Sequence, residues 1–97
     1  MKAVFISYNQ ALSERIIAIL DRRHIRGYSL WELTHGRGSF RGEPHYGNHT
    51  WPSMNSSILT VIDDEKVAPL LASLRDLDSQ TEQQGLRAFV WDVVDQL

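Results

Sequence analysis

Four strand-like segments and two helical segments follow one another along this chain, and their order constrains the fold more than any other feature. Runs rich in β-branched and aromatic residues cover residues 2–8, 28–33, 57–62 and 86–94. Helical periodicity covers residues 11–24, where Asn9 is the expected N-cap and Gly27 the expected end. A second helix is expected after Asp63 and Asp64, which can cap it. The order is therefore strand, helix, strand, strand, helix, strand.

This order predicts an α+β fold of the ferredoxin-like βαββαβ type, with a four-stranded antiparallel sheet and two helices on one face. At 97 residues the chain has room for one hydrophobic core, so residues 1–97 are expected to form a single domain. The second helix carries apolar residues at helical spacing, namely Val67, Leu70, Leu71, Leu74 and Leu77.

Apolar side chains are expected on both faces of the sheet. Alternation places Val4 and Ile6 on one face and Ala3 and Phe5 on the other. The later strands repeat this pattern, with Ile58 and Ile62 opposed to Leu59 and Val61, and with Ala88 and Val90 opposed to Phe89, Trp91 and Val93. Two helices can cover only one face of the sheet. The apolar residues of the other face therefore predict a closed homo-oligomer, in which further copies of the chain cover them. The alternative is that the second face is partly polar near the strand ends.

Charge and composition limit the kinds of partner and the cellular location that can be expected for this chain. The chain has 10 basic and 12 acidic residues and a net charge of −2, which predicts no nucleic-acid partner. Cysteine is absent, which is compatible with a reducing compartment. The apolar run from Ala3 to Ile6 is too short for a signal peptide or a membrane span, so a cytoplasmic location without membrane insertion is expected.

Several motifs in order resemble the PII nitrogen-regulatory and PII-like signalling proteins. They are the segments 27–33, 36–38, 61–67, 80–81 and 88–93, together with Gly85. The resemblance implies a ferredoxin-like homotrimer that binds a small effector, commonly an adenine nucleotide, in clefts between subunits. It also implies a loop between the second and third strands, here about 37–55, that docks on a partner such as a membrane transporter or an enzyme.

The candidate effector-binding residues are glycines and arginines near that loop and near the turn before the last strand, namely Gly36, Arg37, Gly38, Arg41, Gly85 and Arg87. Ordinary turn geometry and surface arginines are the alternative explanation. The turn before the last strand lacks the glycine-rich stretch and the lysine of PII proteins, and their basic C-terminal segment has no counterpart. These departures make adenine nucleotide doubtful and predict weak or absent binding of ATP and ADP.

The loop also supplies candidate metal ligands and docking residues. Glu43, His45 and His49 combine a carboxylate with two imidazoles, which suits a zinc or copper ion, although no cofactor is certain. Solvent-exposed or hydrogen-bonded histidines are the alternative. The aromatic residues Phe40, Tyr46 and Trp51 are candidates for docking a partner, or else for packing against the protein's own surface.

The predicted function is therefore that of a regulatory, signal-transducing trimer that senses a small effector or a transition-metal ion, and not that of an enzyme. One alternative is a small phosphatase of acylphosphatase type, but the junction Ser7-Tyr8-Asn9-Gln10 between first strand and first helix lacks the arginine of that family. No arrangement of serine, histidine and aspartate suggests a nucleophile with its base. A purely structural interaction module is the other alternative.

Overall fold

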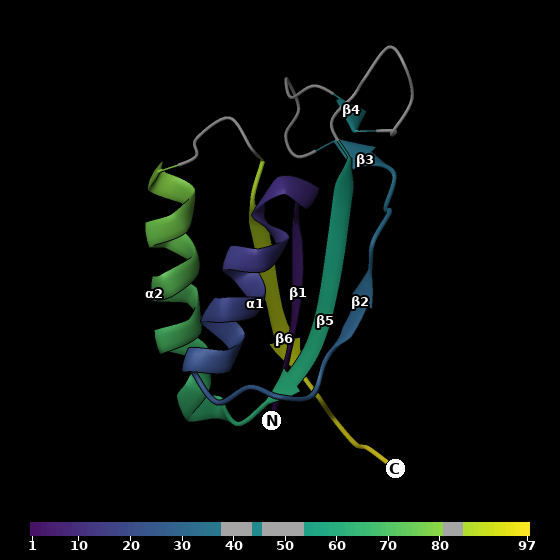
Figure 1. Ribbon diagram of the computed structural model, residues 1–97. Helices are drawn as coiled ribbons and strands as arrows, with labels where there is room; N and C mark the ends of the chain where they lie inside the picture. Colours follow the sequence, from purple (N-terminus) through teal and green to yellow (C-terminus); the bar gives the residue numbers. More distant parts are fainter. Residues whose placement is uncertain (38–43, 46–53, 81–84) are drawn as a thin grey trace.

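A computed structural model describes residues 1–37, 44–45, 54–80 and 85–97, and its elements follow the predicted order (Figure 1). The main elements are β1 (Lys2–Asn9), a 3-10 turn (Gln10–Leu12), α1 (Ser13–Arg22), β2 (Ser29–Trp31), β5 (Asn55–Ile62), α2 (Asp64–Gln80) and β6 (Arg87–Asp92). Two short strands, β3 (Gly36–Arg37) and β4 (Pro44–His45), pair with each other and were not predicted. Among the described residues, no helix is long and apolar enough to cross a membrane.

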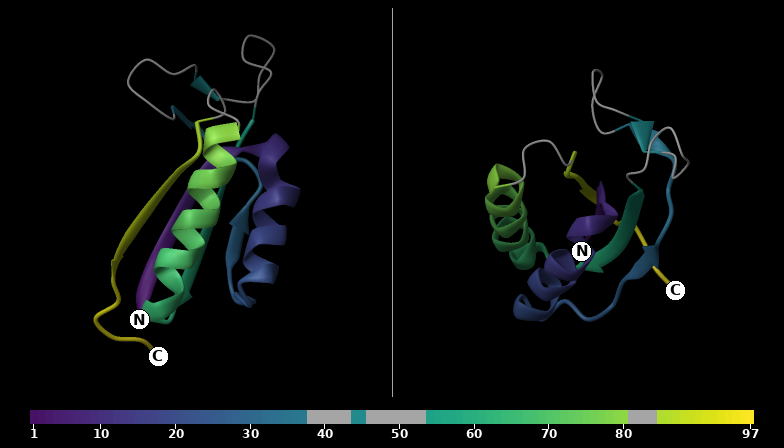
Figure 2. Two further views of the ribbon diagram at one scale, coloured as in Figure 1. Left: turned by 90° about the vertical axis from the view of Figure 1, so that its left-hand side faces the viewer. Right: turned by 45° about the horizontal axis from the view of Figure 1, so that its top comes forward.

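The main sheet is antiparallel, with the strand order β2-β5-β1-β6. Both helices lie on the same side of it (Figures 1 and 2). The predicted ferredoxin-like α+β fold is confirmed. We call the side of the sheet opposite the helices the open face.

The core lies between the sheet and the helices. Val4, Ile6 and Tyr8 of β1 are fully buried there, and they pack with residues that include Ile16, Leu20, Ile58, Leu70 and Leu74. The Tyr8 hydroxyl lies 2.9 Å from the Ser13 hydroxyl, which gives this buried polar group a partner. Burial raises the pKa of Tyr8 above its ordinary value, so the side chain stays neutral in the folded protein.

The first helix begins as predicted but ends elsewhere. The Asn9 side chain accepts a hydrogen bond from the Ala11 N–H at 2.9 Å, which confirms it as a cap, although it caps the 3-10 turn that precedes α1. Gly27 does not end the helix. His24 does, with a positive φ of 57°, and the N–H groups of His24 and Ile25 donate to the carbonyls of Asp21 and Leu20. This is a Schellman cap with a non-glycine residue in the left-handed position.

His24→Gly is therefore expected to stabilise the protein by about 0.5–1 kcal/mol, because glycine adopts a positive φ without steric cost. Urea unfolding at equal protein concentration measures the change. Gly27→Ala is the matched control and is expected to be close to neutral, since a Cβ at Gly27 meets nothing within 4 Å. A His24→Gly variant less stable than the native protein would contradict the assigned cap.

The edge strand β2 is shorter than predicted, because side-chain hydroxyls replace part of its ladder. Only Ser29, Leu30 and Trp31 pair with β5. On either side of this ladder, the Thr60 hydroxyl donates to the Gly27 carbonyl at 2.6 Å and the Ser56 hydroxyl donates to the Glu32 carbonyl at 2.7 Å. Residues 27–34 therefore follow the edge of β5, attached largely through its side chains.

Candidate functional site

Strand register divides the open face into an apolar end and a polar end. Residues directly opposite each other in an antiparallel pair project to the same face, so each row across the sheet can be read from the pairing. The apolar end consists of Ala3, Phe5, Leu59, Val61, Phe89 and Trp91, with Ser29 of β2 at the edge of the row that contains Phe5. The polar end begins at the next row, which consists of Arg87, Ser7, Ser57 and Trp31, and continues into Asn9 and Asn55.

Large apolar side chains of this face remain exposed in the single chain. Phe89 is 58% exposed, Trp91 49% and Val61 41%. The two-sided apolar pattern is therefore confirmed at this end, including the opposition of Phe89 and Trp91 to Ala88 and Val90, whereas the polar end agrees with the alternative that the second face is partly polar near the strand ends. An apolar surface of this kind on a sheet is typical of a protein–protein contact.

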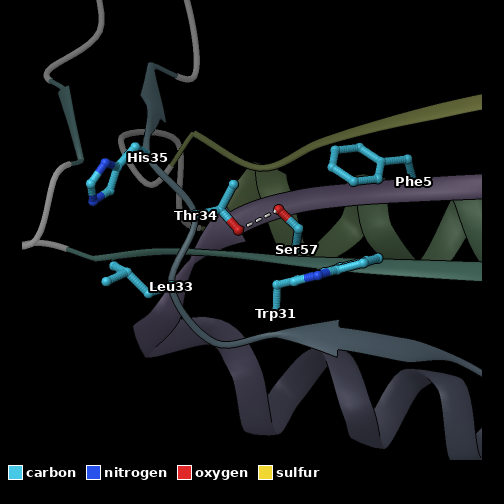
Figure 3. Close-up of a pocket in the computed structure, with 6 residues that line it drawn as sticks. All are labelled: Phe5, Trp31, Leu33, Thr34, His35 and Ser57. Carbon is cyan, nitrogen blue, oxygen red and sulfur yellow. Dashed lines mark hydrogen bonds between the residues drawn. The ribbon is translucent and has the colours of Figure 1, made fainter.

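A hollow of about 520 Å³ lies where the two ends of the open face meet. Its lining comes from β1, β2, β5 and the segment after β2, and consists of Phe5, Trp31, Leu33, Thr34, His35 and Ser57. Figure 3 shows the Phe5 and Trp31 rings beside the pair formed by Thr34 and Ser57. The hollow thus combines aromatic surfaces with hydroxyl groups, which suits a ligand that has both apolar and polar parts.

Hydrogen bonds fix the segment that forms one wall of the hollow. The Thr34 N–H donates to the Asn55 carbonyl at 2.6 Å, and the Ser57 hydroxyl donates to the Thr34 hydroxyl at 2.9 Å. The Asn55 side-chain amide donates to the Ser7 hydroxyl at 2.8 Å, which joins β5 to β1 in the same region. These contacts hold the chain against β5 just before it enters β3.

The predicted effector residues are divided between two edges of the sheet. Gly36 and Arg37 form β3, where they pair with His45 and Pro44 of β4, at the end of the sheet beyond the hollow (Figure 1). Gly85, with a φ of 73°, and Arg87 lie at the start of β6, on the opposite edge but at the same end. Gly38 and Arg41 lie outside the described residues.

One chain does not bring these two groups together. β2 and β6 are the outer strands of a four-stranded sheet, which sets them roughly 14 Å apart at the usual spacing between strands. Arg87 is exposed, and its guanidinium donates to the carbonyl of the neighbouring Leu86 at 2.7 Å. The backbones of the two groups are therefore too far apart to contact one small anion together.

Arg87 is also a cation, and the described strand positions of its face carry no acidic residue. None of the strand positions that project to the open face carries aspartate or glutamate. The ion pairs of the described residues lie at the other end of the sheet, between the Met1 amine and Asp64 at 3.0 Å and between Lys2 and Asp92. Their hydrogen bonds lower the pKa of Asp64 and raise the pKa of Lys2. The polar end is thus left with positive charge.

The predicted metal and docking residues fall mostly outside the described part of the chain. This applies to Glu43, His49, Phe40, Tyr46 and Trp51, whereas His45 is described as part of β4. Within the described ranges there is no group of three histidine, cysteine or acidic residues able to hold a metal ion.

The hollow and the row that ends at Arg87 were not predicted from the sequence, apart from Arg87 itself. The signal that points to them is the alternation of the strands, which places Phe5 and Trp31 on the open face. The hydroxyl pair of Thr34 and Ser57 left no comparable pattern, because it joins residues 23 apart in the sequence.

Known proteins that resemble this chain were found among solved structures. No protein-family model matches the chain, and no curated protein does so. One of the similar solved structures is that of CPII from Thiomonas intermedia, a nitrogen regulatory PII-like protein solved with ADP, AMP and bicarbonate. It is similar to this chain with a TM-score of 0.77 and 24% sequence identity, and the match covers 95% of this chain and 84% of CPII. CPII bound to ADP and bicarbonate gives 0.76 and 25%, with the same coverage. A chain from Thermus thermophilus described as a PII-like signalling protein gives 0.68 and 22%, covering 95% and 85%.

These neighbours confirm the resemblance to PII-like proteins, and this chain has their fold. They also correct one prediction. Adenine nucleotide was held doubtful, with zinc or copper as the candidate cofactor, but CPII is solved with ADP and AMP and provides no support for a metal. The doubt rested on the missing glycine-rich stretch, the missing lysine and the missing basic C-terminal segment, although Arg87 begins β6 directly after that turn and arginine binds phosphate in a bidentate manner.

Proposed function

We propose that this chain, which has the fold of the PII-like signalling proteins, is a regulatory homotrimer whose open faces pack against one another. The exposed apolar end supports this proposal, because Phe89, Trp91 and Val61 lose contact with water on assembly. A regulatory role is also in keeping with CPII, which is described as nitrogen regulatory. The proposal assigns no catalytic residue to the chain.

The proposed effector is an adenine nucleotide held between neighbouring subunits at the polar end of the open face. Arg87 supplies a guanidinium to the phosphates, and backbone N–H groups around Gly85 or Gly36 add donors. Arg37 and Arg41 are further candidates for the same anion. The aromatic surfaces of Phe5 and Trp31 in the hollow offer a purine ring a place to stack.

One observation carries this proposal. Arg87 and the β3 base of the loop lie at the same end of the sheet but on opposite edges, and no carboxylate occupies the strand positions of the face between them. Packing of open faces would remove water from Arg87, and a guanidinium without an anion is costly to desolvate. A bound nucleotide phosphate relieves that cost.

Isothermal titration of the native protein with ADP and with AMP tests the proposal. We expect a dissociation constant on the order of 10 µM or tighter for at least one of them. A second titration adds bicarbonate, the other ligand seen with CPII, and is expected to change the nucleotide affinity if both share the cleft. Absence of binding at millimolar nucleotide, in a protein shown to be folded, would overturn the nucleotide assignment.

The response is proposed to pass through the loop 37–55 to a partner protein such as a transporter or an enzyme. The pairing of β3 with β4 lies in the first part of this loop, and β3 directly follows the wall of the hollow. A ligand in the hollow would therefore contact the chain next to the loop. Phe40, Tyr46 and Trp51 are the proposed docking residues.

A further inference from the structure

A groove of about 340 Å³ runs between the two helices, on the side of the molecule away from the sheet. Arg15, Ala18, Ile19 and Arg22 of α1 line one side of it, and Ser73, Asp76, Leu77 and Gln80 of α2 line the other. Ile19 and Leu77 are buried, whereas the two arginines and Gln80 are exposed. The groove therefore has an apolar floor, a basic wall and a polar wall that carries one carboxylate, that of Asp76.

The basic wall carries two guanidinium groups at a defined spacing. Arg15 and Arg22 are seven residues apart in α1, which corresponds to two helical turns or roughly 10 Å. Among the described residues, the ion pairs are those of Met1 with Asp64 and of Lys2 with Asp92, so neither arginine has a described carboxylate partner, although Asp76 lines the same groove. Two positive charges are thus available to an external anion.

The end of the groove is held by a cross-helix contact. The Arg23 guanidinium, just after α1, donates from Nε and Nη2 to the Ser73 hydroxyl of α2 at 3.2 and 2.9 Å. This contact joins the two helices and adds a third arginine beside the basic wall.

The groove stays accessible in the proposed assembly. It belongs to the helical layer, whereas the open face that packs against other copies is on the far side of the sheet (Figure 2). A partner can therefore occupy the groove without competing with oligomerisation or with the nucleotide cleft.

We propose that this groove binds an acidic helical segment of a partner protein, with two carboxylates two turns apart that pair with Arg15 and Arg22. A helix that lies along the groove presents residues i and i+7 at the same roughly 10 Å spacing as the two arginines. Its apolar side would rest on Ile19 and Leu77, and a basic residue on it would meet Asp76. This contact goes beyond the proposed function, which assigns partner docking to the loop 37–55.

The test uses a fluorescent 15-residue alanine-rich helical peptide with glutamates at i and i+7, and fluorescence anisotropy with the full chain. We expect binding that weakens as salt is raised, and that falls at least tenfold in the variant Arg15→Glu, Arg22→Glu. A peptide with lysines in place of the two glutamates is expected to bind that variant and not the native protein. The matched control is Arg26→Glu, Arg75→Glu, which makes the same charge change on residues that do not line the groove.

Three results would overturn the proposal. They are absence of peptide binding to the native protein, equal loss of binding in the groove variant and the control variant, and equal binding of peptides with glutamates at i and i+7 or at i and i+2. Circular dichroism of each variant establishes that it is folded, and the charge-swapped lysine peptide keeps the test decisive because it demands a gain of binding.

Discussion

Phe89→Asp is expected to prevent the proposed assembly and to leave a folded monomer. Phe89 is 58% exposed in the single chain and lies in the apolar end of the open face. In a closed assembly the new carboxylate would be taken out of water among the apolar side chains of this end, at a cost of several kcal/mol per subunit. Light scattering coupled to size exclusion at micromolar concentration measures the mass, and circular dichroism shows that the monomer is folded.

The neighbouring position provides a matched control. Val90 belongs to the same strand but packs against the core between sheet and helices. Val90→Asp is therefore expected to unfold the chain, and not only to dissociate it. A native protein that is monomeric at micromolar concentration, or a Phe89→Asp variant that keeps the native mass, would contradict the assembly through the open face.

Arg87→Ala is expected to weaken the proposed ADP binding by about 10- to 100-fold while leaving the mass of the protein in solution the same as that of the native protein. A hydrogen bond to a charged group contributes about 1.5–3 kcal/mol, and each 1.4 kcal/mol corresponds to a factor of ten in affinity. In the single chain the exposed Arg87 side chain donates to the Leu86 carbonyl, so the substitution removes one surface hydrogen bond, and circular dichroism checks that the variant is folded. Isothermal titration with ADP measures the effect.

Arg22→Ala removes an arginine from the helical layer and is the control for this loss of charge. It is expected to keep the native affinity for ADP. Equal affinity in the native protein and the Arg87→Ala variant would mean that the phosphates are held by other donors, and would move the assignment to the loop base at Arg37.

The order of the elements and the two faces of the sheet could be predicted from the sequence, because both depend on local periodicity. Phe89 and Trp91 were placed opposite Ala88 and Val90 by alternation alone, and the register confirms it. The end of α1 could not be predicted in this way. Glycine is the usual residue in a left-handed cap, whereas here His24 adopts that conformation and the buried Ile25 and Leu20 complete the cap.

The candidate site was predicted in fragments. Arg87, Gly36 and Arg37 were chosen for their chemistry, but their positions on opposite edges of the sheet depend on strand order, which no local pattern states. β3 and β4 escaped prediction because a two-residue strand shows no alternation, and one of them contains Pro44. The hollow depends on hydroxyl contacts between distant segments, and these have no periodic signature.

The way in which β2 is attached has a consequence for dynamics. Its ladder with β5 is three residues long, and much of the remaining attachment of residues 27–34 comes from hydroxyl groups at the sheet edge. The apolar side chains of this strand are only partly buried, since Leu30 is 36% and Trp31 48% exposed. The segment can therefore detach by local unfolding at a much smaller free-energy cost than β1 or β5. A ligand that needs the intact hollow would bind only the state in which residues 27–34 are attached to β5. Part of its binding free energy would then oppose the local unfolding of this segment, which directly precedes the loop.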